Sequence, residues 1–116
     1  MRLEIDPLSG EPPFEQVRRQ VAEGAASGSF PAGHRLPTVR ALATAHDLAV
    51  NTVAKAYRAL EADGVVETRG RAGTFVASRT AADSGTDAAA RAYVLEARRQ
   101  GLSRDEAVRL LETHWS

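Results

Sequence analysis

Residues 36–76 restrict the possible folds of this chain more than any other stretch, because they predict two short helices followed by a hairpin. Thr38 is a favourable N-cap, so the first helix is expected from there to about Ala45. The second helix is expected over residues 50–62, where apolar side chains recur at helical spacing and Gly64 is a typical C-terminal stop. This pattern predicts a helix-turn-helix.

Two β-branched or aromatic runs, residues 65–68 and 74–77, come after the second helix. Residues 69–73, with two glycines and two arginines, join them and predict a hairpin with a basic tip, called a wing. Such a motif commonly places its second helix in the major groove of DNA and its wing on the backbone or in the minor groove. The alternative is a winged-helix adaptor that binds only protein, because a fold does not fix a function.

Length and composition set further bounds. The 116 residues suffice for one small domain and an appendage, and the absence of cysteine excludes a disulfide frame and a cysteine-based zinc site. No apolar run approaches the ~20 residues of a transmembrane helix, and there is no signal-peptide core, so we expect a cytoplasmic protein. No phosphate-binding loop, paired-histidine zinc motif or nucleophile elbow occurs, so we expect neither an enzyme nor a cofactor or metal, and a small hydrolase ranks last.

Basic and acidic residues balance at 15 each, which counts against a purely electrostatic DNA binder and favours the adaptor as the alternative. Within residues 1–78, six of the nine bases nevertheless lie in or beside the predicted motif and wing, while most of the nine acids fall elsewhere. Ten residues of this region are candidates for DNA contacts: Arg35, Thr38, Arg40, Asn51, Thr52, Lys55, Arg58, Arg69, Gly70 and Arg71.

The candidates suit different parts of DNA. Arg40 has the donors for bidentate bonds to phosphate or guanine, and Thr38 suits a phosphate at the N-terminus of its helix. Asn51 is suited to adenine, Thr52 to a thymine methyl group or a phosphate, and Lys55 to a guanine edge or a phosphate. The wing residues are expected to contact phosphate or the minor groove.

An ordered series of motifs over about residues 8–78 resembles the GntR family of bacterial transcriptional regulators. The series is Phe14-Glu15-Gln16-Val17, Gly28, Pro31, Gly33, Leu36-Pro37-Thr38-Val39-Arg40, Leu42-Ala43, Asn51-Thr52-Val53, Ala56-Tyr57, Leu60-Glu61, Gly64-Val65-Val66 and Gly73-Thr74-Phe75-Val76. The segment after residue 78 is similar to the short two-helix tail of the YtrA-like subfamily. The resemblance implies operator binding, and it implies that the tail pairs two subunits.

The chain departs from the family at the start of the second helix. Many members have DNA-contacting arginines where Val50 and Ala54 stand, although YtrA-like members often have apolar residues there. Ala49 stands where a serine or asparagine N-cap is common, so Asn51 either reads a base or caps this helix.

The residues before the motif also predict local structure. Residues 2–6 alternate apolar and charged, which favours a short edge strand or an extended arm. A helix is expected to open at Pro12 and Pro13, to bury a stripe that includes Val17, and to end at Gly28. His34 is expected to be a surface turn residue rather than a ligand.

Residues 79–87 are small and polar, which is typical of a linker, and two amphipathic helices are expected after it. The first spans residues 88–100, and the second starts at Ser103 with the spacing of a capping box. Helices this short are marginal alone, so they either pack on their own winged helix or form a symmetric dimer interface. The interface candidates are Tyr93, Val94, Ala97, Val108, Leu111 and Trp115.

The sequence therefore predicts a mainly α fold with a small β-hairpin: a winged helix-turn-helix over residues 1–78, a linker over 79–87 and a helical dimerisation tail over 88–116. The predicted function is a sequence-specific transcriptional regulator, a repressor that binds a palindromic double-stranded operator as a homodimer. A small-molecule effector, of unknown identity, would bind near the interface or linker and change the spacing of the two DNA-binding units.

Overall fold

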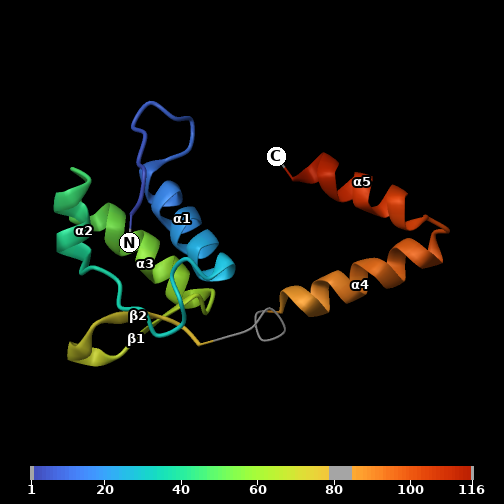
Figure 1. The fold of residues 1–116 in the computed structure, drawn as a ribbon. Helices are drawn as coiled ribbons and strands as arrows, with labels where there is room; N and C mark the ends of the chain where they lie inside the picture. Colours follow the sequence, from blue (N-terminus) through green and yellow to red (C-terminus); the bar gives the residue numbers. More distant parts are fainter. Residues whose placement is uncertain (1, 79–84, 116) are drawn as a thin grey trace. The chain divides into compact units, whose positions relative to one another are not determined.

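The computed structural model of the chain describes residues 2–78 and 85–115. The chain divides into two compact units, Met1–Arg79 and Thr80–Ser116, which we call the winged unit and the tail unit (Figure 1). The winged unit contains α1 (Pro13–Ser27), α2 (Val39–Ala45), α3 (Val50–Ala62), β1 (Val66–Thr68), a 3-10 turn η1 (Gly70–Ala72) and β2 (Thr74–Val76). The tail unit contains α4 (Thr86–Arg99) and α5 (Arg104–His114).

The core of the winged unit lies where α1, α2 and α3 pack together over the hairpin. Apolar residues at helical spacing form one stripe on each helix, and these stripes face each other. The largest fully buried side chains are Val17 and Val21 of α1 and Val53 and Leu60 of α3. The hairpin contributes Val66 and Val76 to this core, so it packs against the helices of the winged unit.

Local capping chemistry explains where the two helices of the motif begin and end. The Thr38 hydroxyl accepts a hydrogen bond from the Ala41 N–H at 3.0 Å, which confirms the predicted N-cap and starts α2 one residue later, at Val39. Helix α3 has the predicted bounds, and Gly64 comes after it with a φ of 74°, the left-handed conformation that glycine adopts without strain.

Tyr57 joins the two helices of the motif. Its ring lies on the buried face of α3, and its hydroxyl donates to the Pro37 carbonyl oxygen at 2.7 Å, just before α2. Burial raises the pKa of Tyr57 to about 12. The tyrosine thus stays protonated and fixes the angle at which the chain enters α2.

The hairpin is antiparallel, with Val66 opposite Val76 and Thr68 opposite Thr74. An additional bridge pairs Arg35 with Phe75, so the segment before α2 lies along the hairpin. At the tip, Gly73 has a φ of 116°, and a Cβ there would lie 3.0 Å from the Arg35 Nε. Glycine therefore allows the Arg35 side chain to lie against the wing.

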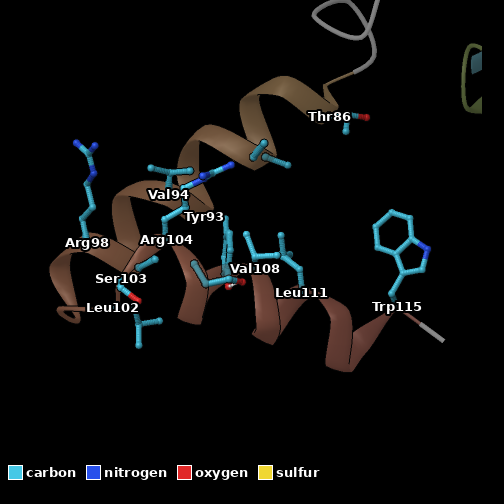
Figure 2. Close-up of a pocket in the computed structure, with 14 residues that line it drawn as sticks. Thr86, Tyr93, Val94, Arg98, Leu102, Ser103, Arg104, Val108, Leu111 and Trp115 are labelled. Carbon is cyan, nitrogen blue, oxygen red and sulfur yellow. Dashed lines mark hydrogen bonds between the residues drawn. The ribbon is translucent and has the colours of Figure 1, made fainter.

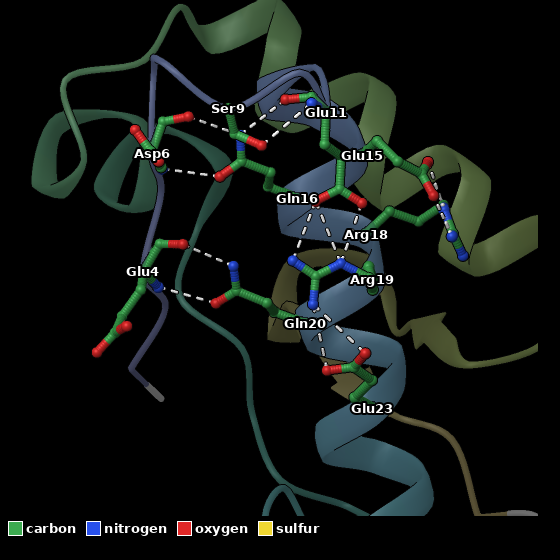
Figure 3. Close-up of polar contacts among 10 residues, drawn as sticks. All are labelled: Glu4, Asp6, Ser9, Glu11, Glu15, Gln16, Arg18, Arg19, Gln20 and Glu23. Atoms are coloured by element: carbon green, nitrogen blue, oxygen red, sulfur yellow. Dashed lines mark hydrogen bonds and ion pairs between the residues drawn. The ribbon is translucent and has the colours of Figure 1, made fainter. Parts of the chain in front are cut away.

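Residues 2–6 form an extended arm rather than a strand. The Gln20 side chain accepts from the Glu4 N–H and donates to the Glu4 carbonyl, at 2.8 and 2.7 Å. Gln16, a buried residue of α1, accepts from the Asp6 N–H and donates to two backbone carbonyls of the N-terminal segment (Figure 3). The two glutamines make the hydrogen bonds that a neighbouring strand would otherwise make.

The tail unit is a pair of helices. Helix α4 begins at Thr86, two residues before its predicted start, and its N-cap residue is Gly85, which has a left-handed conformation with a φ of 82°. The Ser103 hydroxyl accepts from the Glu106 N–H while the Glu106 carboxylate accepts from the Ser103 N–H, which confirms the capping box at α5. Most of the predicted linker, residues 79–84, lies outside the described residues.

Candidate nucleic-acid interface

The outward face of α3 presents a row of polar side chains. Asn51, Lys55 and Arg58 are exposed and Thr52 is half-buried, because the opposite face of the helix is committed to the core. Four of the predicted DNA-contacting residues thus lie on one face of one helix, within the helix's first three turns. This is the arrangement by which a recognition helix reads base edges in a major groove.

Helix α3 has no side-chain cap. Its N-cap residue is Ala49, and no side chain accepts a hydrogen bond from the first turn. Asn51 therefore does not cap α3 in this structure, which excludes one of the two roles left open for it. Its exposed amide makes no hydrogen bond to any described residue and has both a donor and an acceptor for a base edge.

Helix α2 and its N-cap carry two further candidate DNA-contacting residues, Arg40 and Thr38. Arg40 is exposed and has no ion pair within the described part of the chain. The Thr38 hydroxyl accepts the capping hydrogen bond from Ala41, but a hydroxyl also carries its own proton. Thr38 can therefore cap α2 and donate to a phosphate oxygen at the same time.

Lys55 is held by an aromatic ring. Its Nζ lies 3.9 Å from the centre of the Phe14 ring, at the N-terminal end of α1. This distance is that of a cation–π contact, which leaves the other faces of the ammonium group open. Phe14 is not among the predicted DNA-contacting residues, and nothing in the spacing of the sequence connects it to Lys55.

The wing carries its bases at and around the tip. The Arg69 guanidinium lies 4.3 Å from the centre of the Phe75 ring and donates to the Glu67 carboxylate at 2.9 Å through Nε. Arg71 and Gly70 form part of the exposed 3-10 turn at the tip. One predicted wing cation, Arg69, is therefore partly neutralised, whereas Arg71 has no acidic partner among the described residues.

The bases of α1 differ from those of the motif, because they are neutralised within the helix surface. Arg18 pairs with Glu15, whose pKa is lowered by the hydrogen bond from Arg18, and Arg19 pairs with Glu11 and Glu23 (Figure 3). Arg40, Lys55 and Arg58 lack carboxylate partners in residues 2–78 and 85–115. Although the charges of the whole chain balance, these three bases are not neutralised by ion pairs within the described residues, as the bases of α1 are.

The tail unit contains an apolar groove of about 740 Å³ between α4 and α5. Figure 2 shows Tyr93, Val108 and Leu111 in the space between the two helices and Trp115 at the end of α5. The Tyr93 hydroxyl donates to the Ala107 carbonyl at 2.8 Å and joins the helices. All six predicted interface residues line this groove, and Trp115 is 80% exposed.

The described residues can also be checked for a metal-ion site, for the role of His34 and for a membrane-spanning helix. No group of three or more histidine, aspartate or glutamate side chains is arranged to hold a metal ion within them. His34 stacks on Phe30, with ring centres 6.2 Å apart, and is therefore a packing residue of the turn before α2. None of the helices in the described ranges has the length and hydropathy needed to cross a membrane.

Residues 13–76 match the family described as bacterial regulatory proteins, gntR family. The HTH-type transcriptional regulator Rv1152 of Mycobacterium tuberculosis is 49% identical over 112 residues, covering 97% of this chain and 92% of that protein. The HTH-type transcriptional repressor YtrA of Bacillus subtilis is 45% identical over 75 residues, covering 64% of this chain and 57% of YtrA. A solved structure of AraR(DBD) in complex with operator ORX1 is 27% identical, with a TM-score of 0.58 over 66% of this chain and 99% of that chain.

Proposed function

This chain belongs to the gntR family of bacterial regulatory proteins, and we propose that it is a repressor. We propose further that it binds a palindromic operator as a homodimer. It is a DNA-binding transcriptional regulator, and its relatives are regulators rather than enzymes. The relative YtrA is named a repressor, which supports repression here. A regulator of bacterial operators acts in the cytoplasm, where the DNA lies.

One observation supports the proposed DNA-binding surface most strongly. The arginines of α1 are neutralised by carboxylates, whereas Arg40, Lys55 and Arg58 of the motif have no such partners among the described residues. Charges that pair inside the protein contribute little to the field outside it. The unpaired bases of α2 and α3 therefore support this face of the winged unit as the one that attracts phosphate.

The proposed contacts are set by the chemistry of each side chain. Asn51 and Thr52 at the start of α3 reach base edges, and Arg40 and Lys55 contact guanine or phosphate. The wing places Arg71 on the backbone or in the minor groove, with Arg69 beside it. Arg35, Thr38, Arg58 and Gly70 complete the contact surface.

The tail unit is the proposed dimer interface. Its groove exposes apolar side chains from both α4 and α5, and a second copy of the tail would cover them. A symmetric pair would present two α3 helices to half-sites about one helical turn apart, ~34–36 Å, or a multiple of it. A small effector that binds near this groove would act by favouring one of two dimer arrangements.

The test compares substitutions on the proposed surface with one away from it. Arg40→Ala and Lys55→Ala should each weaken binding to a duplex selected by the wild-type chain from a random pool, by about 1–3 kcal/mol. Arg91→Ala removes the same charge from an exposed position of α4 and serves as the matched control. Affinity is measured by gel shift at several salt concentrations, because phosphate contacts make it fall steeply with salt.

Two results would contradict the proposal. If the selection returns no preferred duplex, the chain is not a sequence-specific DNA binder. If Arg40→Ala, Lys55→Ala and Arg91→Ala bind the selected duplex equally well, the surface is misplaced even though the chain binds DNA.

A further inference from the structure

Two residues from different helices meet beside the proposed recognition surface. Phe14 stands on the first turn of α1, where Pro13 opens the helix, and its ring is half-buried against the core. Lys55 stands on the exposed face of α3, and its Nζ lies 3.9 Å from the centre of that ring. Because the core restrains the ring on one side, the lysine meets it at a defined position.

The contact restricts a side chain that is otherwise among the most flexible in proteins. A free lysine loses rotamer freedom when it binds, and that loss opposes binding. No carboxylate within ion-pair distance holds Lys55 in the described residues, so the ring is the partner that the structure gives to its ammonium group. A ring face attracts the cation without neutralising it, and the full charge stays available to DNA.

We propose that Phe14 is a positioning residue for DNA recognition, which holds the Lys55 ammonium over its ring in the place where it meets a guanine edge or a phosphate. The proposal rests on the DNA-binding surface proposed above. It assigns a role in DNA recognition to a residue of α1, a helix that contributes no predicted DNA contact of its own.

The expected effect is modest and specific. Phe14→Leu keeps an apolar side chain against the core but removes the ring face, and it should weaken binding to the selected duplex about two- to fivefold. Phe14→Tyr keeps the ring face and should bind within about twofold of the wild type. Thermal unfolding of each variant checks that the winged unit remains folded.

A double-mutant cycle separates positioning from structural support. In a Lys55→Ala background the ring has no ammonium group to hold, so Phe14→Leu should cause no further loss of affinity. Phe30→Leu is the matched control: Phe30 is also half-buried against the core, and its ring partner is His34 rather than a cation. Its effect should be the same with and without Lys55.

The outcomes distinguish this inference from the proposed function. If Lys55→Ala weakens binding but Phe14→Leu has the same cost in both backgrounds, Phe14 is only structural and the inference is overturned, while the DNA-binding surface stands. If Lys55→Ala binds like the wild type, the lysine has no role to be positioned for, and this part of the proposed surface and the inference both fail.

Discussion

The winged unit and the tail unit are both built on amphipathic helices, but they differ in what covers the apolar side chains of those helices. In the winged unit the stripes of α1 and α3 meet each other and the hairpin, and Leu60 is fully buried. In the tail unit, Ala97 is the one buried residue among residues 85–115, while Leu111 and Trp115 are 47% and 80% exposed. Amphipathic helices thus bury their apolar side chains within the winged unit but leave them exposed in the tail unit.

The difference shows that amphipathicity alone does not say where a helix finds its partner. Burying apolar surface stabilises by about 25 cal/mol per Å², so a helix pair that leaves its stripe exposed gives up most of that contribution. Helices of this length are marginal without it. The winged unit obtains this stabilisation from its own core, whereas the tail unit needs a further surface to cover its exposed apolar side chains.

The largest expected effect tests whether stability resides in the winged unit. Leu60→Ala removes a fully buried side chain of α3 and should destabilise the winged unit by about 2–5 kcal/mol, because it also leaves a cavity. Leu95→Ala removes an exposed leucine of α4 and should change stability by no more than about 0.5 kcal/mol. Urea denaturation measures both, and equal effects would contradict the contrast between the units.

The next effect concerns the groove, and two adjacent leucines of α5 provide the comparison. Leu111 lines the groove and Leu110 does not, although they are similarly exposed, at 47% and 43%. Leu111→Asp should weaken the dimer at least about tenfold, because it places an unpaired charge in an apolar interface. Leu110→Asp should leave the dimer intact. Sedimentation over a range of protein concentrations would refute the groove as the interface if both variants behave alike.

The smallest effect tests whether α5 is stabilised by its own cap. Hydrogen bonds from the Ser103 backbone N–H and hydroxyl lower the pKa of Glu106 below its ordinary value of 4.5. A lowered pKa means that the cap contributes fully above pH 4.5 and is lost as the pH falls through the lowered value. The Ser103 amide proton, followed by NMR, should therefore titrate with a midpoint below 4.5. A midpoint at or above 4.5 would show that the capping box does not form.

The sequence predicted the features that depend on local chemistry. Thr38, Gly64 and Ser103 mark helix ends through hydrogen bonds and conformations confined to one turn, and the structure has them where they were expected. The start of α4 at Thr86 was missed, because the small polar residues before it carry no clear start signal. Element type and order were therefore predictable, with errors of a few residues.

Contacts between elements distant in the chain were not predictable. Gln16 and Gln20 look like ordinary helix residues, yet they bind the backbone of the N-terminal arm. The ring beneath Lys55 belongs to α1, far away in the chain, so no spacing in the sequence indicates it. Four candidate DNA residues could be proposed from the sequence because they share one face of α3, whereas the ring that holds Lys55 is brought there by the tertiary fold.

The most direct test of the central claim is sedimentation of the full chain beside a chain that ends at Ser78. The claim is that the winged unit folds alone and that the tail unit pairs two copies. The full chain should therefore sediment as a dimer, and the shortened chain as a folded monomer with the helical content of α1, α2 and α3. A shortened chain that remains as dimeric as the whole would contradict this claim, because the interface would then lie in the winged unit.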